Sequence, residues 1–414
     1  MSNDTASHLL EGPKSIPLEK IDLSNWDIWE QNTAAPYLKR LREEAPLHYT
    51  AQSQYGPYWS VTRYADIKSV DVDHRNFSSA EGVTLDERSK NLNVVSFISS
   101  DPPRHDEQRK TVSPVVAPAN LAKMADVIRA RARRIFDELP IGEPFDWVDR
   151  VSIELTGQML AILLGFPIEE RRKLTYWSDV ATGGPETGVV ASEEARRDAL
   201  MDCLSVFTDL WHERARAELG HDMISMLAHG DKTRDMVENP QEYLGTLTLL
   251  IIGGNDTTRN SLTGGVWALN LFPDQYAKIK ADHSLLDNMV AEIIRWQTPL
   301  SYMRRTATQD VKMHDQTIRK GDKVVMWYAS GNRDETVFAN AEDLDVARKN
   351  ARQHLAFGFG IHRCMGNRLA ELQLRIVWRE LLERYSHVEV VEEPTRLRSN
   401  FVRGYTKMPV VLHV

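Results

Sequence analysis

The sequence predicts a mainly α-helical protein with small β-sheets, an α+β fold built as a single domain. Residues 101–271 carry helical periodicity over most of their length. Short apolar runs bounded by turn residues lie on both sides of that region and indicate strands. No linker divides the chain of 414 residues, of which 42% are hydrophobic and 27% charged, as is typical of a globular protein.

The helices and strands are predicted from hydrophobic periodicity and from the glycine, proline and capping residues that bound each segment. Residues 1–20 are polar and are expected to be a mobile arm before a domain of residues 21–414. Helices are expected at 35–44, 121–138, 151–164, 240–271 and 285–297, with a last helix from Cys364 to about Tyr385. Strands are expected at 47–50, 58–61, 311–313, 317–318 and 323–327, with a final strand pair at 401–403 and 410–413.

Two segments between these elements have readable local chemistry. Asp101-Pro102-Pro103 predicts a helix start, with Asp101 as the capping side chain and the prolines in the first turn. Residues 78–100 show no clear period. A long irregular segment inside a compact domain is either functional or disordered.

Charge and cysteine content exclude several functional classes. The net charge of −8 argues against nucleic acid as a partner. Cys203 and Cys364 are too far apart in sequence to suggest a disulfide framework, which fits a reducing compartment. The longest strongly apolar stretch, 247–254, is far shorter than the roughly 20 residues that span a bilayer. We therefore expect a cytoplasmic monomer without a membrane anchor.

The strongest chemical signal is the segment Phe357-Gly-Phe-Gly-Ile-His362-Arg-Cys364-Met-Gly366. Its glycines permit tight turns and close backbone approach. The lone Cys364 comes just before a predicted helix, whose free N–H groups and dipole lower the pKa of a thiol. A thiolate there is a candidate metal ligand. The alternative is a buried cysteine at a glycine-rich turn.

This segment resembles the signature of the cytochrome P-450 superfamily, Phe-Gly-x-Gly-x-His-x-Cys-x-Gly, at every fixed position. The resemblance, which extends from about Tyr58 to Val414, implies a cytochrome P-450 fold and haem b (iron protoporphyrin IX) held through Cys364. It also implies Phe357 beside the sulfur and Gly366 in the cofactor site. A thiolate on haem iron favours O–O cleavage, so the implied activity is that of a monooxygenase using O₂.

The segment Gly253-Gly254-Asn255-Asp256-Thr257-Thr258 lies inside the long predicted helix. Two glycines inside a helix lower its stability by about 1 kcal/mol each relative to alanine. Such a pair is therefore expected where something must lie directly against the helix backbone. The segment resembles the oxygen-binding motif of the family. By resemblance, Thr257 hydrogen-bonds dioxygen during its activation and Asp256 feeds protons toward it. A helix-packing glycine pair is the alternative from the residues alone.

Two further sets of residues match family positions. Glu292 and Arg295 share one helix face, and by their order in the chain they resemble the buried pair that braces the haem core together with Arg348. The cations that the resemblance places on the haem propionates are His105, Arg109, Arg305 and His362. Arg304 is an alternative to Arg305, and each cation alone could be ordinary surface charge.

The length leaves no room for a reductase domain, and no Rossmann-type glycine motif is present. Resemblance to soluble bacterial members implies a ferredoxin with its NAD(P)H-dependent reductase as electron donor. A basic patch for that acidic partner is expected from Arg104, Lys110, Arg363 and Arg368, which could equally be ordinary surface charge.

The expected substrate pocket is mostly apolar, so a small apolar substrate is expected. Its candidate residues are Phe97, Leu249, Ile252, Gly253, Leu300, Met303, Phe401 and Val402. The two motifs look most like those of the bacterial alkane and fatty-acid terminal (omega) hydroxylases. Open alternatives are a hydroxylase of terpenoids or sterol side chains, a peroxide-driven enzyme, and a non-catalytic haem-thiolate sensor.

Overall fold

The computed structural model describes residues 13–86 and 95–414. Its α-helices are α2 (Trp26–Glu30), α3 (Ala34–Glu44), α4 (Tyr64–Val72), α6 (Arg104–Val112), α7 (Pro118–Asp137), α8 (Glu154–Leu164), α9 (Arg171–Thr182), α10 (Glu193–Arg216), α11 (Met223–His229), α12 (Pro240–Leu271), α13 (Pro273–Ala281), α14 (Leu286–Gln297), α15 (Tyr328–Gly331) and α16 (Asn367–Arg384). Its strands are β1 (Leu47–Thr50), β2 (Tyr58–Val61), β3 (Phe77–Ser78), β4 (Phe145–Asp146), β5 (Met303–Ala307), β6 (Val311–Met313), β7 (Gln316–Ile318), β8 (Lys323–Met326), β9 (His387–Val390), β10 (Thr395–Arg396), β11 (Tyr405–Lys407) and β12 (Pro409–His413).

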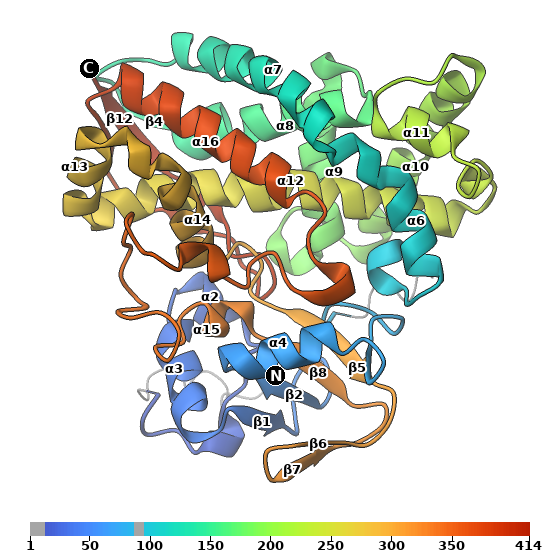
Figure 1. The fold of residues 1–414 in the computed structure, drawn as a ribbon, viewed down its shortest axis with the longest axis vertical. Coiled ribbons are helices and arrows are strands. Elements are labelled where there is room, and N and C mark those ends of the chain that lie inside the picture. The colour runs from blue at the N-terminus through green and yellow to red at the C-terminus, as the bar shows by residue number, and fades with distance from the viewer. Residues whose placement is uncertain (1–12, 87–94) are drawn as a thin grey trace.

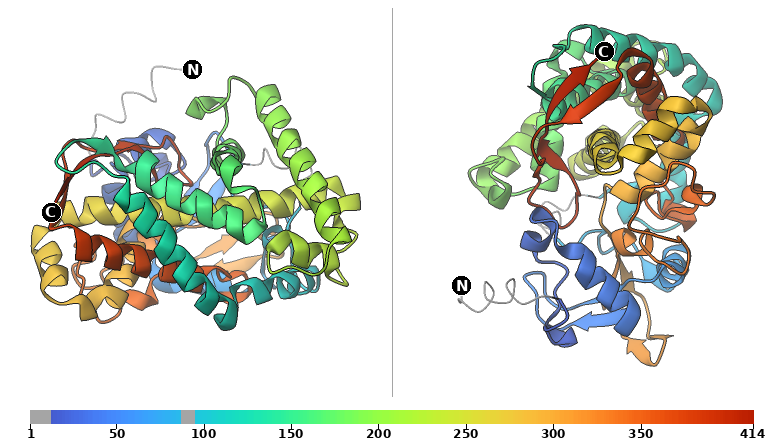
Figure 2. Two further views of the ribbon diagram at one scale, coloured as in Figure 1. Left: turned by 90° about the horizontal axis from the view of Figure 1, so that it is seen from above. Right: turned by 90° about the vertical axis from the view of Figure 1, so that its left-hand side faces the viewer.

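A large helical part lies above a smaller part built on the main sheet (Figure 1). The long helix α12 runs through the helical part and, seen end-on, lies at its centre (Figure 2). It packs against α8, α9, α14 and α16, and α16 packs in turn against α7. Leu262, Val266, Ile293 and Trp378 are buried where these helices meet. The central helix is therefore enclosed by its neighbours and can carry a buried site.

The main sheet has the strand order β1-β2-β8-β5-β3. Only the β2–β8 pair is parallel, and Arg305 of β5 lies opposite Val324 of β8. The hairpin of β1 and β2 was predicted at the residues where it occurs, with Leu47 opposite Val61. The predicted strand at 311–313 is likewise confirmed as β6. These strands were predictable because alternation and flanking turns are local signals.

The predicted strand pair at the C-terminus is wrong. Residues 401–403 make only an isolated bridge, between Val402 and Leu300. The strand β12 pairs instead with β9 and β4. β4 lies far back in the chain, and β9 lies shortly before the adjacent segment, so the choice among these partners depends on tertiary packing.

The helix start at Asp101 also differs from prediction. Helix α6 begins at Arg104, and no side chain caps it. The Asp101 carboxylate instead accepts hydrogen bonds from the Ser78 hydroxyl and the Ser79 N–H, the latter at 3.1 Å. Asp101 therefore joins the irregular segment to α6, because a distant pair of donors competes successfully with the local cap.

The N-terminal arm is packed where the structure describes it. Ile16 is buried, and its carbonyl oxygen and that of Pro13 accept hydrogen bonds from Arg40. The Leu18 carbonyl lies 2.8 Å from His48 Nε2. Residues 13–20 thus differ from the expected mobile arm, and residues 1–12 lie outside the described range.

Within residues 13–86 and 95–414, none of the helices combines the length and the apolar character needed to cross a membrane.

Candidate active site

A cavity of about 480 Å³ lies between α12, the cysteine loop at 357–366 and β5. Of the predicted pocket residues, the following line it: Phe97, Leu249, Ile252, Gly253, Leu300, Met303 and Phe401. Val402 does not, because its side chain is buried and its backbone bridges to Leu300. The irregular segment contributes to the wall on both sides of its undescribed part, through residues 80–84, 86 and 95–99. That location supports a functional role for the segment.

The cysteine loop presents Cys364 to this cavity. The Cys364 N–H donates to the Phe357 carbonyl oxygen at 2.8 Å, which closes the loop. The N–H groups of Gly366 and Asn367 hydrogen-bond the sulfur. Gly358 and Gly360 have positive φ values of 64° and 65°, a conformation that favours glycine. The thiol is therefore deep in the protein but accessible from the cavity.

The pKa of Cys364 differs in direction from the prediction. Burial raises it, and the surrounding N–H groups together with Arg109 and Arg363 only oppose that effect. The helix begins at Asn367, three residues beyond the sulfur, so its dipole alone does not outweigh the loss of water. A metal ion on the sulfur would supply the missing stabilisation of the thiolate.

Two histidines meet beside the loop. The rings of His105 and His362 lie edge to face with centroids 4.5 Å apart. His105 Nδ1 lies 2.7 Å from Asp106, and His362 Nε2 lies 2.9 Å from the Ser79 hydroxyl. The remaining nitrogens, His105 Nε2 and His362 Nδ1, are buried without a hydrogen-bond partner. Unpaired buried polar atoms are rare, so this pair indicates a ligand with acceptor groups.

The sequence left open whether Arg304 or Arg305 faces a cavity ligand, and their contacts differ. Arg305 lines the cavity, whereas Arg304 does not line it and donates to the carbonyls of Glu81 and Thr84. Arg109 also lines the cavity, and its Nη2 donates to the Arg363 carbonyl. The geometry therefore favours Arg305 over Arg304 as the residue that faces a cavity ligand.

The glycine pair of α12 has two different neighbours. A Cβ atom built on Gly253 would meet nothing within 4 Å, so this face of the helix is open to the cavity. A Cβ atom on Gly254 would lie 2.8 Å from Leu160 of α8. Gly253 thus leaves room for a ligand, and Gly254 allows close helix packing. Both explanations that the residues left open apply, one to each glycine.

Asp256 and Thr257, which follow the glycine pair in the chain, lie on different sides of α12. Thr257 lines the cavity, and its hydroxyl donates to the Gly253 carbonyl at 3.1 Å. Asp256 is fully buried on the side that faces α9, where its Oδ1 accepts from Arg259 at 2.8 Å. Arg259 also donates to Asp179 of α9 at 2.9 Å. Burial raises the pKa of Asp256, and the Arg259 charge opposes that shift.

Comparison with known proteins decides the family. A cytochrome P450 family model matches residues 213–409. Linalool 8-monooxygenase of Pseudomonas putida is 36% identical over 95% of this chain and 99% of its own length. The chain belongs to the cytochrome P450 family. A structure of CYP153D17 from Sphingomonas is 45% identical and superposes with a TM-score of 0.90 over 96% of this chain and 100% of its own. A methyl-branched lipid omega-hydroxylase of Mycobacterium tuberculosis is 31% identical over 96% of each chain.

The cytochrome P450 fold and its haem b cofactor are thus established for this chain, an O₂-dependent monooxygenase. The residues present fit that cofactor. The sulfur faces the cavity, the face of α12 at Gly253 is open to the same cavity, and His362, which lines it, has an unpaired nitrogen that can donate to a propionate. His105 does not line the cavity and packs against the His362 ring instead. Haem supplies the oxygen chemistry, and this chain supplies the ligand, the cations and a shaped apolar wall.

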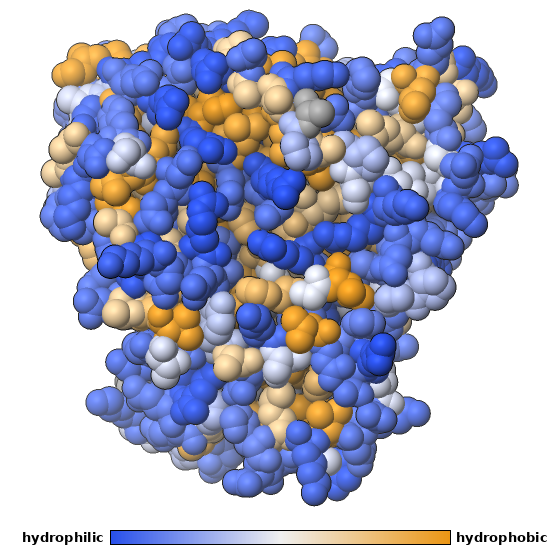
Figure 3. Space-filling view, in the orientation of Figure 1, coloured by the Kyte–Doolittle hydropathy of each residue, from blue (hydrophilic) through white to orange (hydrophobic). Residues whose placement is uncertain are grey.

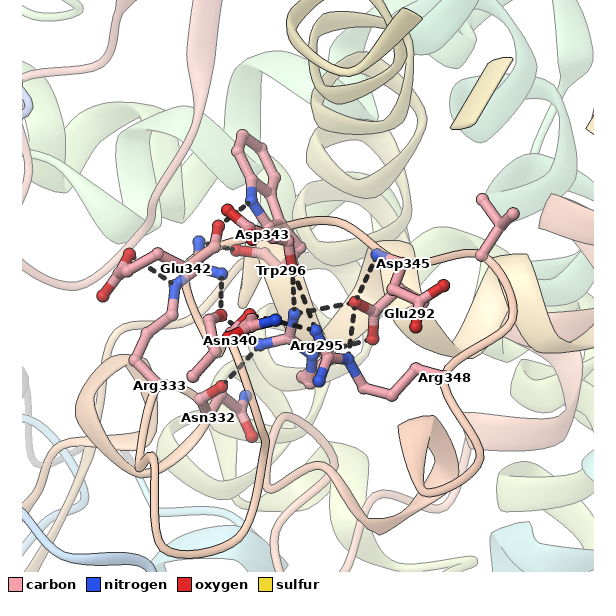
Figure 4. Close-up of polar contacts among 12 residues, drawn as sticks. Glu292, Arg295, Trp296, Asn332, Arg333, Asn340, Glu342, Asp343, Asp345 and Arg348 are labelled. Carbon is pink, nitrogen blue, oxygen red and sulfur yellow. Dashed lines mark hydrogen bonds and ion pairs between the residues drawn. The ribbon is translucent and has the colours of Figure 1, made fainter. Parts of the chain in front are cut away.

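A buried ionic cluster of this P450 joins α14 to the segment that follows α15 (Figure 4). Glu292 and Arg295 of α14 are both 0% exposed and form a bidentate pair with two distances of 2.7 Å. Arg348 adds a second bond to Glu292 at 2.9 Å. Arg295 also donates to the carbonyls of Asn332, Ala341 and Asp343. The three residues predicted to act together do so, and they tie α14 to residues 332–348.

Sequence reasoning missed two polar residues at this site. Asp71 of α4 accepts a hydrogen bond from Arg305 at 2.8 Å, and Arg259 pairs with Asp256. Arg259 is three residues after Asp256, a spacing that could have indicated the pair. Asp71 lies 234 positions from Arg305, and no local pattern marks it.

Substituting Gly253 is expected to block the cavity without unfolding the helix. Gly253→Leu places a side chain in open space, so we expect the dissociation constant of a medium-chain substrate to rise by about tenfold or more. Gly253→Ala is the graded control, because alanine favours the helix by about 1 kcal/mol and adds little volume. Spin-state titration measures both. Equal affinities in the two variants would contradict a substrate-facing Gly253.

Substituting Thr257 is expected to separate electron consumption from product formation. Thr257→Val keeps the shape and removes the hydroxyl, so product per electron should fall by roughly tenfold or more while electron consumption continues. Thr248→Val is the matched control, since Thr248 also lines the cavity and bonds a backbone carbonyl four residues earlier. Product yield and NADH consumption are measured together. Equal coupling in both variants would contradict a role for Thr257 in oxygen activation.

Proposed function

We propose that this P450 hydroxylates the terminal methyl group of a medium-length apolar chain, an alkane or a fatty acid. The observation that carries the proposal is the apolar wall next to Cys364, made by Leu249, Ile252, Leu300, Met303 and Phe401. The cavity also carries charged residues such as Arg109 and Arg305, but an apolar stretch of its wall selects a hydrocarbon segment of the substrate. Similarity to a methyl-branched lipid omega-hydroxylase supports the same choice.

A second candidate substrate class is the terpenoids. The 36% identity to linalool 8-monooxygenase over nearly the full length of both chains favours it. A branched terpenoid and an unbranched chain would share the same wall, but they differ in width. Hydroxylation of a sterol side chain is a third possibility for a cavity of this composition.

We assign the following roles to the site residues. Cys364 would hold the haem iron through its sulfur, with Phe357 and Gly366 around that sulfur. His105, Arg109, Arg305 and His362 bind the propionates. Thr257 hydrogen-bonds the oxygen substrate, and Asp256 moves protons toward that site from the side of α9. Glu292, Arg295 and Arg348 hold the structure behind the haem.

The test is a spin-state titration with a graded set of alkanes, fatty acids, linear terpenoids and a sterol, followed by turnover and product analysis. The proposal expects the largest spin shift from a medium-length linear chain and a terminal alcohol as the main product. A terpenoid alcohol as the main product, or hydroxylation at internal carbons, would overturn it. Absence of product and of substrate-dependent electron consumption would indicate a sensor.

We propose a ferredoxin, itself reduced by an NAD(P)H-dependent reductase, as the electron donor. The face that carries α4 and α16 is mostly hydrophilic, with apolar side chains between the helices (Figure 3). Lys110, Arg363 and Arg368 are exposed, while Arg104 is paired with Glu242 at 2.8 Å. Exposed cations next to the cysteine loop favour an acidic partner there.

Reversing two of these charges is expected to weaken the binding of ferredoxin without changing the reaction at the haem. Lys110→Glu with Arg368→Glu should raise the KM for ferredoxin by about tenfold at low salt and flatten its salt dependence. Peroxide-supported turnover of the same variant should be unchanged, since it needs no partner. Lys312→Glu, an exposed cation on β6, is the control. An unchanged KM in the double variant would place the docking surface elsewhere.

We also propose that the enzyme is a cytoplasmic monomer. Cys203 is fully buried within the helical core and Cys364 serves as ligand, so neither is available for a structural disulfide. That use of cysteine suits a reducing compartment. Size-exclusion chromatography with light scattering tests the monomer.

A further inference from the structure

Asp71 is a buried carboxylate next to the haem site that the reaction does not use. It belongs to α4 and is 2% exposed. Its Oδ1 accepts from Arg305 Nη2 at 2.8 Å. Its Oδ2 accepts from the Tyr328 hydroxyl at 2.8 Å and from the Phe359 N–H at 2.7 Å. One carboxylate thus joins the sheet, α15 and the cysteine loop.

The backbone around Asp71 fixes it in this position. A Cβ atom at Gly360 would lie 2.5 Å from the Asp71 carbonyl oxygen and 3.0 Å from Val72 Cα. A Cβ atom at Gly358 would lie 3.2 Å from Asp71 Oδ2 and from the Tyr328 hydroxyl. The end of α4 is therefore pressed against the loop that carries Cys364. Its carboxylate cannot shift without moving that loop.

Asp71 is also the ion-pair partner of Arg305. The guanidinium lies in the cavity wall, donates to Asp71 on one side and to the Arg304 carbonyl on another, and is itself nearly fully buried. Charges removed from water interact strongly over distance. A cation near haem favours the reduced iron, because reduction adds one negative charge. An anion that partly neutralises this cation has the opposite effect.

We propose that Asp71 is a positioning residue that lowers the reduction potential of the haem iron by partly neutralising Arg305, while it holds the cysteine loop against α4. The inference rests on the proposed placement of Arg305 beside the cofactor. It adds a determinant that the oxygen motif and the cysteine signature do not contain.

The test is the midpoint potential of the substrate-free holoenzyme, measured by spectroelectrochemistry. Asp71→Asn keeps an oxygen acceptor for Phe359 and Tyr328 but removes the charge, so it should raise the potential. Arg305→Gln should lower it. In the double variant the buried charge pair is absent, so its potential should return close to that of the wild type. The expected single-variant change is about tenfold in the oxidised-to-reduced ratio, or about 59 mV for one electron.

Two controls separate charge from structure. Tyr328→Phe removes one donor to Asp71 without changing charge and should leave the potential near the wild-type value. Glu380→Gln removes another buried carboxylate, one paired with Arg133 at 2.9 Å outside the cavity wall, and should also have no effect. The reduced carbon monoxide spectrum of each variant verifies that the thiolate is still bound.

The outcomes are distinct. If Arg305→Gln leaves the potential unchanged, the placement of Arg305 beside the haem is wrong and the inference fails with it. If Arg305→Gln lowers the potential but Asp71→Asn does not raise it, Asp71 has no such role although the haem site stands. If the Asp71→Asn variant does not retain haem, the midpoint potential of the double variant decides whether Asp71 has the proposed role. A potential close to wild type supports the inference, and one as low as that of Arg305→Gln overturns it.

Discussion

Cys364→Ser is expected to remove the strongly red-shifted Soret band of the reduced carbon monoxide complex, and with it the monooxygenase activity. Serine keeps the size of the side chain but replaces the sulfur, and a thiolate is what favours O–O cleavage at haem iron. Loss of a hydrogen-bonding partner of a metal ligand typically costs roughly 10–100-fold. Loss of the ligand itself should cost more than that. The spectrum and the turnover rate are measured on the same preparation.

Cys203 supplies the control for this experiment. Its side chain is fully buried in the core formed with Phe207 and Trp211, and burial raises its pKa. Cys203→Ala should therefore leave the Soret band in place, whatever it does to stability. If Cys364→Ser keeps the band, or if Cys203→Ala loses it, the ligand has been assigned to the wrong cysteine.

The cysteine loop could be located from sequence because its motif is local. The glycines, His362 and Cys364 lie within ten residues, and their match to the family signature identifies the loop. The α12 motif is local in the same way, and the helix that contains it was predicted from Pro240 to its end at Phe272-Pro273. Periodicity and short-range chemistry were sufficient for these features.

Features that depend on distant contacts could not be predicted. Val402 was expected in the pocket, but its bridge to Leu300 turns it into the core. Asp101 had the sequence of a helix cap, but Ser78 and Ser79 bind it. Asp71 resembles any polar residue of an amphipathic helix until the fold brings Arg305 to it. In each case the deciding partner lies far along the chain.

The charge of buried groups was the other source of error. The helix dipole was expected to lower the pKa of Cys364, and burial raises it instead. Sequence shows which charges are near in the chain, but not how much water the fold removes. The same limit concealed the different surroundings of Asp256 and Thr257. Adjacent residues of one helix face a buried ion pair and an open cavity, respectively.

Arg295→Ala is expected to have the largest effect on stability. It leaves Glu292 at 0% exposure with one cation fewer, and it leaves the carbonyls of Asn332, Ala341 and Asp343 without their donor. Removing one partner of a buried ion pair typically lowers the free energy of unfolding by about 3–5 kcal/mol. Since the cluster ties α14 to residues 332–348, the variant should also release haem more readily. Thermal unfolding and the absorbance of retained haem measure both effects.

An exposed arginine–glutamate pair provides the matched control. Arg134 of α7 lies 3.4 Å from Glu138, with side chains 73% and 67% exposed. Water already screens that pair, so Arg134→Ala should change the free energy of unfolding by less than about 1 kcal/mol. Both variants remove an arginine from a short-range ion pair of a helix, and they differ in burial. If they lowered stability equally, the contribution of Glu292 and Arg295 would come from helix chemistry alone, and the bracing role of the cluster would be wrong.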